Sequence, residues 1–544
     1  MPFPEKLSPE TEKRLLEAAG CYEAGHVEET LLRVRALLAD TGPSAPALEL
    51  LGLALLKHQK PDEAADALDQ ALGLNPGSTT ILFALGVALS DGGRWREARD
   101  CYDRLLVRMP DHIDGRFNHA RALEELGDIQ AAQAAYAACL KQAPNHLEAA
   151  AHLAALLEES NQPEEARHWI ARVRARDPRH VLARLVEAQL DLRQERFEQA
   201  LAGLDALARE HPSPINAAVI AGRQVRALDG LGRYPDAFRA AAVGHLHLAH
   251  LDAGRTQNGP YGIATVERLI QHAPKMRLTG SHTIHAPAER GHHLVFLVGF
   301  PRSGTTLLDR MLAAHPDITV LEEDNPFAAS LGALVELLDQ GAHDPLSHPL
   351  VQTPLASAIR QVRSRMSGPD AQVVDKLPLN SIYALWLHLL LPEARFVVAV
   401  RDPRDVCISC FLQVFAPNPA MRQFWSLAST ARYYDRVMTL LRLAREQILP
   451  ESRIRIQPYE HLLEHPESSL RNLADFLGVR FAPEMAEPHR SIRGVRIGTP
   501  SYDQVARPLY TDSIGRWRNY QTELAPILPV LESWVRYWGY APTP

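Results

Sequence analysis

Prolines recur every 34 residues through the first half of the chain, at Pro76, Pro110, Pro144, Pro178 and Pro212. Two columns with the same period hold only small residues and start at Gly52 and Ala64, while a third, from Leu68 to Leu204, is large and apolar throughout. A fixed period of this length indicates a repeat array, because a single globular core imposes no such spacing. Small columns that face large ones at helical spacing predict stacked pairs of helices.

Each repeat reads as helix A, a turn marked by residues such as Gly93 or Gly127, helix B, and a proline that ends helix B. This pattern resembles the tetratricopeptide repeat (TPR) over about residues 45 to 245, after a degenerate leading unit near 10 to 43. In the last unit the segment LGRYPDA is displaced by three residues, which predicts a longer turn. The resemblance implies an all-α solenoid whose concave face binds a peptide or protein, although a structural or dimerising role stays open.

We therefore divide the chain into a TPR helical repeat array at 1–251, a connector at 252–290 that contains some helix (TVERLIQHA), and a second domain at 291–544. Hydrophobic residues make up 46% and charged residues 23%, which excludes disorder as the main state. A net charge of -7 excludes a chain-wide basic field for nucleic acid or an anionic membrane. Five cysteines form no disulfide framework, and the apolar stretches are too short to span a membrane. The expectation is a cytoplasmic protein.

A strand, a phosphate loop and a helix are predicted at the start of the second domain, where LVFLVGF is followed by PRSGTTLLDRMLAAHP. Gly299 and Gly304 have the spacing of GxxxxGK[ST], but Thr305 stands where the lysine of a nucleotide triphosphatase would be. The loop instead carries Arg302, and hydroxyl side chains follow at Ser303 and Thr306. Such a loop at a helix N-terminus suits one phosphate-type group.

A second anion site is predicted about a hundred residues later, where the strand ARFVVAV is followed by RDPRDVCISCF. Arg401 lies at the carboxyl end of that strand, and Ser409 follows eight residues later on a helix. An arginine fork and a hydroxyl can clamp a phosphate together. Because ligands of doubly wound sheets bind at the carboxyl ends of the strands, both sites would serve one nucleotide with separate 5′ and 3′ anions.

These two motifs resemble those of the sulfotransferases that use 3′-phosphoadenosine 5′-phosphosulfate (PAPS) as sulfuryl donor. EED at 322–324, VVDKLPLN around Lys376 and SYDQVARPLYTDSIGRW at 501–517 are similar to motifs of the tyrosylprotein sulfotransferase branch. The resemblance covers about residues 291 to 520 and implies an α/β, P-loop-like, parallel-sheet sulfotransferase domain after the TPR solenoid.

The resemblance also implies roles for individual residues in donor binding. The 5′ end of PAPS would be bound by Arg302, Ser303, Gly304, Thr305 and Thr306. The 3′-phosphate would be bound by Arg401 and Ser409 with support from Arg516, and Trp517 belongs to the segment that closes over the nucleotide. No metal is demanded by this chemistry.

For catalysis, the resemblance implies that Arg302 also lies near the transferring group. Lys376, assisted by Ser501, would stabilise the charge on the bridging oxygen. Glu323 stands 21 residues after Arg302, as in the family motif, and would accept the proton of the acceptor hydroxyl, with Glu322 as a substitute.

Several alternatives stay open at this stage. His315 could be a base, but at the end of a helix a capping residue is favoured, and Cys407 and Cys410 are interpreted as helix-packing thiols. The whole chain could instead be a P-loop kinase or NTPase that has lost its lysine, or a TPR scaffold with a degenerate nucleotide-binding domain. The sequence does not identify the acceptor, for which a tyrosine, a phenol or a glycan hydroxyl are the alternatives.

Overall fold

The computed structural model describes residues 8–253, 259–276, 293–368, 371–487 and 511–543. By its internal contacts the chain divides into two compact units, Met1–Val186 and Glu187–Pro544, which are described separately. The division does not fall at the end of the repeats, because the last repeats pack with the parallel sheet of the second half.

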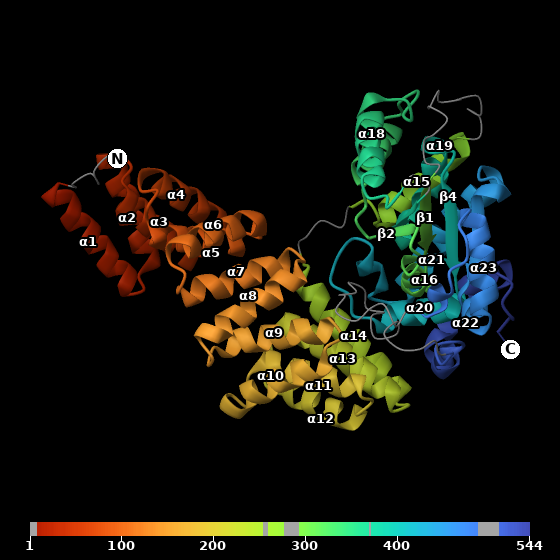
Figure 1. Cartoon of the computed structure of the whole chain (residues 1–544), viewed down its shortest axis with the longest axis horizontal. Coiled ribbons are helices and arrows are strands. Elements are labelled where there is room, and N and C mark those ends of the chain that lie inside the picture. The colour runs from red at the N-terminus through yellow and green to blue at the C-terminus, as the bar shows by residue number, and fades with distance from the viewer. Residues whose placement is uncertain (1–7, 254–258, 277–292, 369–370, 488–510, 544) are drawn as a thin grey trace. The chain divides into compact units, whose positions relative to one another are not determined.

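The repeat array (residues 8–253) consists of antiparallel helical hairpins (Figure 1). Its helices are α1 Pro9–Glu23, α2 Val27–Thr41, α3 Ala45–Lys57, α4 Pro61–Leu74, α5 Thr79–Asp91, α6 Trp95–Arg108, α7 Ile113–Glu125, α8 Ile129–Gln142, α9 Leu147–Glu159, α10 Pro163–Arg176, α11 Val181–Arg193, α12 Phe197–Ala208, α13 Pro214–Gly230 and α14 Tyr234–Leu251. Each of the first four periodic prolines follows the end of a helix B, as predicted.

The predicted turns between helices A and B adopt the left-handed backbone conformation. Gly93 and Gly127 have φ of 74° and 78°. The same position in other units is occupied by Gln59, Asn161 and Glu195, each with φ of 57° or 58°. The turn geometry is therefore shared by the units even where glycine, the residue that favours it, is absent.

The small columns allow the helices of a hairpin to approach closely. A Cβ atom added to Gly52 would lie 2.4 Å from Cγ of Leu68, and one added to Gly86 would lie 2.5 Å from Cε1 of Tyr102. Leu68 and Tyr102 are both fully buried. The large column thus fills the space that the small column leaves, as the periodicity predicted.

The last hairpin corrects one prediction. Its turn is not longer, because three residues separate α13 from α14, as they separate α5 from α6. Instead α13 has 17 residues where α5 and α7 have 13, so the helix is extended by about one turn. The displacement of LGRYPDA comes from this longer helix.

After α15 (Ile263–Met276), which accounts for the helix predicted in the connector, the sheet domain (residues 293–543) contains a five-stranded parallel sheet in the order β2-β3-β1-β4-β5. The strands are β1 Leu294–Gly299, β2 Ile318–Glu322, β3 Gln372–Lys376, β4 Arg395–Val400 and β5 Ile454–Pro458. The predicted strands β1 and β4 are confirmed and lie next to each other, as an α/β fold of the P-loop type requires.

Both faces of the sheet are covered by helices (Figure 1). Val295 and Leu297 of β1 pack with α16 (Thr305–Ala313), α22 (Tyr459–Glu464) and α23 (Pro466–Leu477). Phe296 and Val298 point to the other face, whose helices are α17 Ala328–Asp339, α18 Pro349–Arg363, α19 Ala384–Leu390, α20 Pro403–Leu412, α21 Leu427–Gln447 and α26 Leu528–Tyr537. Burial on both faces explains the continuous apolar runs of β1 and β4.

The same hydrophobic core extends from the sheet domain into the last repeats. Residues of α13 and α14, such as Val225 and Ala241, belong to one cluster with Phe296 and Phe411. Phe238 of α14 stacks on Phe411 of α20 with 4.5 Å between ring centroids. The final hairpin is therefore a part of the second compact unit.

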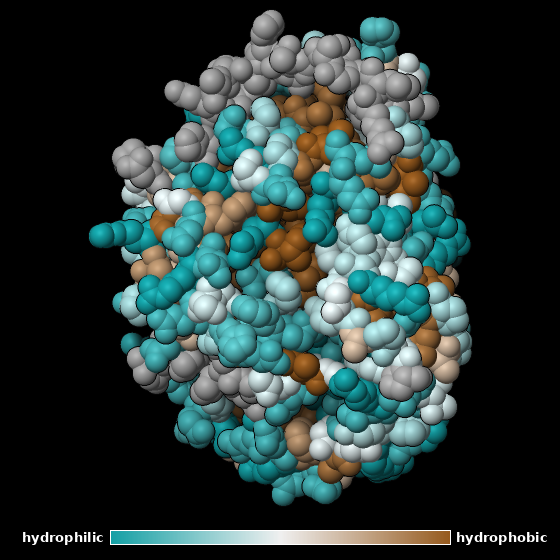
Figure 2. All heavy atoms as spheres, turned by 90° about the vertical axis from the view of Figure 1, so that its right-hand side faces the viewer, coloured by the Kyte–Doolittle hydropathy of each residue, from teal (hydrophilic) through white to brown (hydrophobic). Residues whose placement is uncertain are grey.

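Figure 2 shows one face of the molecule on which hydrophilic residues predominate and apolar side chains are confined to a narrow strip. Among the described helices, none combines the length and the apolar character that crossing a lipid bilayer requires.

Candidate active site

The strand order places a row of charged residues along the carboxyl edge of the sheet. From one side to the other, the strand ends lead to Glu322 and Glu323 after β2, Lys376 at the end of β3, the phosphate loop after β1, and Arg401 after β4. Parallel strands end at the same edge, so motifs far apart in the sequence meet there.

The phosphate loop between β1 and α16 is tightly constrained. Gly304 has φ of 94°, and a Cβ atom there would lie 2.4 Å from Cδ2 of Tyr459. A Cβ atom on Gly299 would lie 2.6 Å from the carbonyl oxygen of Ala399. Arg302 also has a positive φ, of 69°, which costs about 1–3 kcal/mol for a residue with a side chain and is concentrated at functional sites.

The hydroxyl residues of the loop lie at the start of α16. Ser303 precedes the N-cap residue Gly304, and Thr305 and Thr306 are the first two residues of the helix. All three side chains are buried. The first turn of a helix presents backbone N–H groups without an intrahelical acceptor, and this is the local structure expected of an anion site.

The two predicted anion sites meet at one point. Arg302 Nε donates to Oγ of Ser409 over 3.0 Å, although 107 residues separate them. Arg401 Nη1 donates to the carbonyl oxygen of Arg302 over 3.4 Å. Burial, reinforced by the positive charges of Arg401 and Arg516, lowers the pKa of Arg302 to about 10. Cations are thus gathered at a buried site, and a bound anion would stabilise them there.

On the other side of the loop, Lys376 is enclosed by acids. Its Nζ lies 3.1 Å from Oε1 of Glu323, 3.4 Å from Oε1 of Glu322 and 3.4 Å from Oδ2 of Asp309. Lys376 and Asp309 are fully buried, whereas the side chain of Glu323 is 49% exposed. Glu322 also pairs with Arg310 of α16. Of the two candidate bases, Glu323 is therefore the one that solvent or an acceptor can reach.

The charges of this cluster shift one another. Burial alone would lower the pKa of Lys376, but Asp309, Glu323 and Glu322 outweigh it and raise that pKa above its ordinary value. Burial raises the pKa of Asp309 to about 7, against the opposing effect of Lys376 and Arg310. The sequence analysis missed Asp309 and Arg310, whose only signal was their position one helical turn after the loop.

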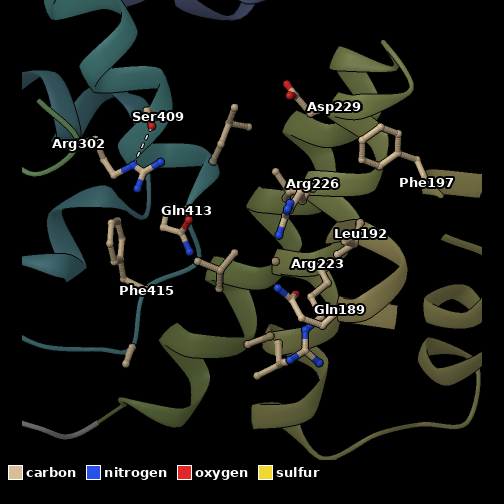
Figure 3. Close-up of a pocket in the computed structure, with 18 of the residues that line it drawn as sticks. Gln189, Leu192, Phe197, Arg223, Arg226, Asp229, Arg302, Ser409, Gln413 and Phe415 are labelled. Atoms are coloured by element: carbon tan, nitrogen blue, oxygen red, sulfur yellow. Dashed lines mark hydrogen bonds between the residues drawn. The ribbon is translucent and has the colours of Figure 1, made fainter. Parts of the chain in front are cut away.

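A cavity of about 830 Å³, the junction cavity, opens beside the phosphate loop (Figure 3). Arg302, Ser409 and Arg516 line it from the sheet domain, and Arg223 and Arg226 of α13 line it from the last repeat. Figure 3 shows the two α13 arginines on the wall opposite the hydrogen-bonded pair of Arg302 and Ser409. The sequence analysis missed the α13 arginines, because nothing in the 34-residue pattern shows which repeat will face the nucleotide loop.

The segment that was expected to close over the nucleotide is anchored at both ends of a short stretch. The N–H groups of Gly515 and Trp517 donate to the carboxylate of Asp405 over 2.8 and 2.7 Å. Arg516 pairs with Asp229 of α13 over 2.8 Å. Trp517 is buried against the guanidinium of Arg404 and does not line the junction cavity, so its contact with the nucleotide stays a prediction. Ser501 lies outside the described residues.

The remaining candidates have structural roles. His315 Nδ1 accepts the N–H of Asp317 over 3.0 Å, and its Nε2 lies 2.6 Å from the carbonyl oxygen of Arg480, so both ring nitrogens are engaged in the turn after α16. Cys407 and Cys410 are buried in α20, as the packing interpretation predicted. Within the described residues, no group of three or more His, Cys, Asp or Glu side chains has the arrangement of a metal site.

Comparisons with known families agree with the two halves of the chain. Residues 295–483 match the sulfotransferase family, and residues 49–113 and 123–190 match the tetratricopeptide repeat. Among solved structures, the crystal structure of YrrB, described as a TPR protein with an unusual peptide-binding site, aligns with 31% of this chain and 88% of that one at 20% identity and a TM-score of 0.30.

Similar curated proteins align with somewhat less than half of the chain. An uncharacterized protein of Aquifex aeolicus is 28% identical over 258 residues, 45% of this chain and 33% of that protein. Protein-tyrosine sulfotransferase 2 of Gallus gallus is 26% identical over 44% of this chain and 68% of that protein. Protein-tyrosine sulfotransferase of Drosophila melanogaster is 25% identical over 44% of this chain and 51% of that protein. The matched region thus spans from a third to about two thirds of the length of these relatives.

Proposed function

Because the chain combines tetratricopeptide repeats with a sulfotransferase-family domain at residues 295–483, we propose that it transfers a sulfuryl group from PAPS to the hydroxyl group of an acceptor. The observation that carries the proposal is the hydrogen bond between Arg302 and Ser409. It joins the predicted 5′ and 3′ anion sites at a single edge of the sheet, as a donor with anions at both ends of one nucleoside requires.

The residues present fit such a donor. The backbone at Gly299 and Gly304 has no room for a Cβ atom, so the loop approaches its neighbours as closely as a phosphate cradle does. Arg302, with Ser303, Thr305 and Thr306, would hold the 5′ end, while Arg401, Ser409 and Arg516 would hold the 3′-phosphate. No metal takes part in the proposal, because the donor charges are met by arginines.

The acid and lysine cluster supplies the catalytic groups. When PAPS is bound, the bond from sulfur to the bridging phosphate oxygen breaks while the acceptor oxygen bonds to sulfur. The carboxylate of Glu323 would take the proton that the acceptor hydroxyl loses. Lys376, 3.1 Å from Glu323, would stabilise the negative charge that develops on the bridging oxygen. Glu322 is held by Arg310 and would position Lys376.

For the acceptor we propose a tyrosine of a protein or peptide, with the concave face of the repeat array holding that protein or a partner. The support is similarity to proteins named protein-tyrosine sulfotransferases, at 25–26% identity over 44% of this chain. The cytoplasmic location predicted from the cysteines belongs to the same proposal. Transfer of labelled sulfate to tyrosine peptides, simple phenols and sugars would identify the acceptor class, and transfer to sugars alone would contradict the tyrosine assignment.

Calorimetry with adenosine 3′,5′-bisphosphate in EDTA tests the donor assignment. We expect the full chain to bind without magnesium and Arg401→Ala to bind about tenfold or more weakly, because a charge-assisted hydrogen bond to phosphate is worth about 1.5–3 kcal/mol. Arg453→Ala is a matched control, since Arg453 pairs with Glu393 away from the predicted donor residues. If the parent chain does not bind the nucleotide, the proposed function is wrong.

A further inference from the structure

The junction cavity lies on one side of the phosphate loop. Its walls in the sheet domain come from Arg302, Ser409, the segment after α20, and Arg516. None of Glu323, Lys376 or Asp309 lines it. In the sheet these acids and the lysine belong to β2, β3 and α16, whereas Ser409 follows β4 on the opposite side of β1. If the acceptor is deprotonated beside Lys376, the junction cavity is on the nucleotide side of the donor.

One face of a repeat helix forms the outer wall of this cavity. Gly222, Arg226 and Asp229 are spaced at i, i+4 and i+7 on α13, and Arg223 stands one turn before Arg226. At this spacing the residues lie on the same side of a helix. Asp229, the neighbour of Arg226 one turn on, pairs with Arg516. Arg226 is therefore next to a residue already predicted to support the 3′-phosphate.

The wall is fixed to the loop that carries Ser409. Val414, five residues after Ser409, packs against two glycines of the final hairpin, with Cβ positions of Gly222 and Gly244 at 3.3 and 2.9 Å from its atoms. His245 Nε2 lies 2.7 Å from the carbonyl oxygen of Phe411. Close packing at these positions prevents α13 from moving independently of α20.

We propose that Arg226, with Arg223 behind it, is a donor-binding residue that contacts the 3′-phosphate side of the nucleotide, so that the last repeat completes the donor site. This inference rests on the proposed function. It assigns the repeat array a role in binding the donor, separate from any role in binding an acceptor. The chemical class recognised is a nucleoside with a 3′-phosphate.

The test measures the affinity of the full chain for adenosine 3′,5′-bisphosphate and for adenosine 5′-monophosphate in EDTA. We expect Arg226→Gln to weaken binding of the bisphosphate by about tenfold, which corresponds to about 1.4 kcal/mol. Binding of the monophosphate should change less than about twofold, since it lacks the 3′-phosphate. Arg226→Lys should be intermediate, because it keeps the charge but loses the guanidinium fork.

Arg233→Gln is the matched control, since Arg233 lies in the same hairpin, pairs with Asp236 at the surface and does not line the cavity. It should bind both nucleotides as the parent does. A second measurement, hydrogen exchange of α13 in the parent chain, should show protection when the bisphosphate is added. It needs no variant, so a folding defect in Arg226→Gln would leave it intact.

The outcomes separate this inference from the proposed function. If the parent binds the bisphosphate but Arg226→Gln binds it equally well, or if both nucleotides are weakened equally, the inference is wrong and the proposed function stands. A raised KM for the acceptor with unchanged nucleotide affinity would also contradict it, because α13 would then face the acceptor. If the parent binds no nucleotide, the proposed function itself fails.

Discussion

At the scale of single residues, the candidate catalytic side chains are held by backbone that is unfavourable for them. Among the described residues of the sheet domain other than glycine, positive φ occurs at Arg302, Glu323 and Asn325. Two of the three are the residues to which proton transfer and sulfuryl binding are assigned. The conformation of Glu323 is fixed by its N–H, which donates to the carbonyl oxygen of Lys376 over 3.0 Å. The same strand end therefore positions both the base and the lysine.

The pair Glu323 and Glu322 allows the assignment of the base to be tested within one motif. We expect Glu323→Gln to lower kcat by about 10² to 10⁴, the usual contribution of general base catalysis, and to leave nucleotide affinity unchanged. Glu322→Gln should have a smaller effect, because Glu322 is engaged by Arg310 and serves to hold Lys376. Steady-state kinetics with a tyrosine peptide measures both. A larger loss in Glu322→Gln would reverse the two roles.

Asp375 predicts a pH dependence of stability. Its carboxylate is fully buried, and among the described residues neither of its oxygens has a hydrogen-bond partner. Burial, with the charge of Asp324, raises the pKa of Asp375 to about 7. In the window between its ordinary pKa and about 7, the folded chain binds more protons than the unfolded chain, so stability falls as pH rises through that window.

Asp375→Asn removes this titration. Relative to the parent, the variant should gain stability as pH rises, by up to about 1.4 kcal/mol per pH unit below the folded pKa, and the gain should level off above about pH 7. The thermal midpoints of both chains, measured from about pH 5 to 8, give the difference. A difference that does not change with pH would mean that Asp375 has an ordinary pKa, and Asp344→Asn at the surface serves as control.

Residues of the site were predictable where one short segment carries a whole function. The phosphate loop and the RDPRDVCIS segment each combine a strand end with an arginine and a hydroxyl, so Arg302 and Ser409 could be paired before their contact was seen. Asp309 and Arg226 were not predictable in this way. A buried acid and an arginine on a repeat helix acquire meaning only from the tertiary contacts around them, and those depend on packing that no local pattern encodes.

At the scale of helices and strands, the period of 34 residues was enough to place the repeat helices, because each column is read several times over. The strands β2 and β5 were missed. Both are edge strands, and ITVLE and IRIQP alternate or interrupt the apolar run that makes β1 and β4 conspicuous. Predicting β2 would have placed Glu322 beside Lys376, since these two residues are register partners.

The small column predicts a position-specific effect of alanine. Gly86→Ala would place a Cβ atom 2.5 Å from the buried ring of Tyr102, so we expect a loss of about 1–3 kcal/mol in local stability. Gly73→Ala is the control, because Gly73 is also helical but has nothing within 4 Å of the added atom, and stability there should be unchanged or raised by up to about 1 kcal/mol. Hydrogen exchange of α4 to α6 in the full chain measures both. Equal behaviour of the two variants would contradict the close approach of α5 and α6.

At the scale of the whole molecule, the compact units cut across the division expected from sequence. The repeats were expected to form one domain up to residue 251, whereas the contacts separate the chain after Val186. The physical reason is that the hairpin of α13 and α14 shares a hydrophobic core with α20 and packs Val414 against Gly222 and Gly244. A repeat pattern identifies helices of equal type, but it does not tell which of them uses its surface for a different neighbour.

Two shortened chains distinguish these descriptions. A chain of residues 178–544 keeps α11 to α14, and we expect it to unfold cooperatively and to bind adenosine 3′,5′-bisphosphate as the full chain does. A chain of residues 252–544 would expose Phe411 and lose its contacts with Phe238, Val225 and Leu228. Since burial of one such side chain is worth about 1.5–3 kcal/mol and a domain is stable by about 5–15 kcal/mol, this chain should be strongly destabilised.

The measurements are circular dichroism on heating and calorimetry with the bisphosphate, made on both chains and on the full protein. Loss of folding in 252–544 with retention in 178–544 is the expected result, because only the longer chain keeps the α13 wall of the junction cavity and the Asp229 partner of Arg516. If residues 252–544 fold and bind the nucleotide with the affinity of the full chain, the expected boundary at 251 is right and the last hairpin is a covering element without a part in donor binding. Failure of 178–544 alone would instead show that the repeats before α11 are needed for the second unit to fold.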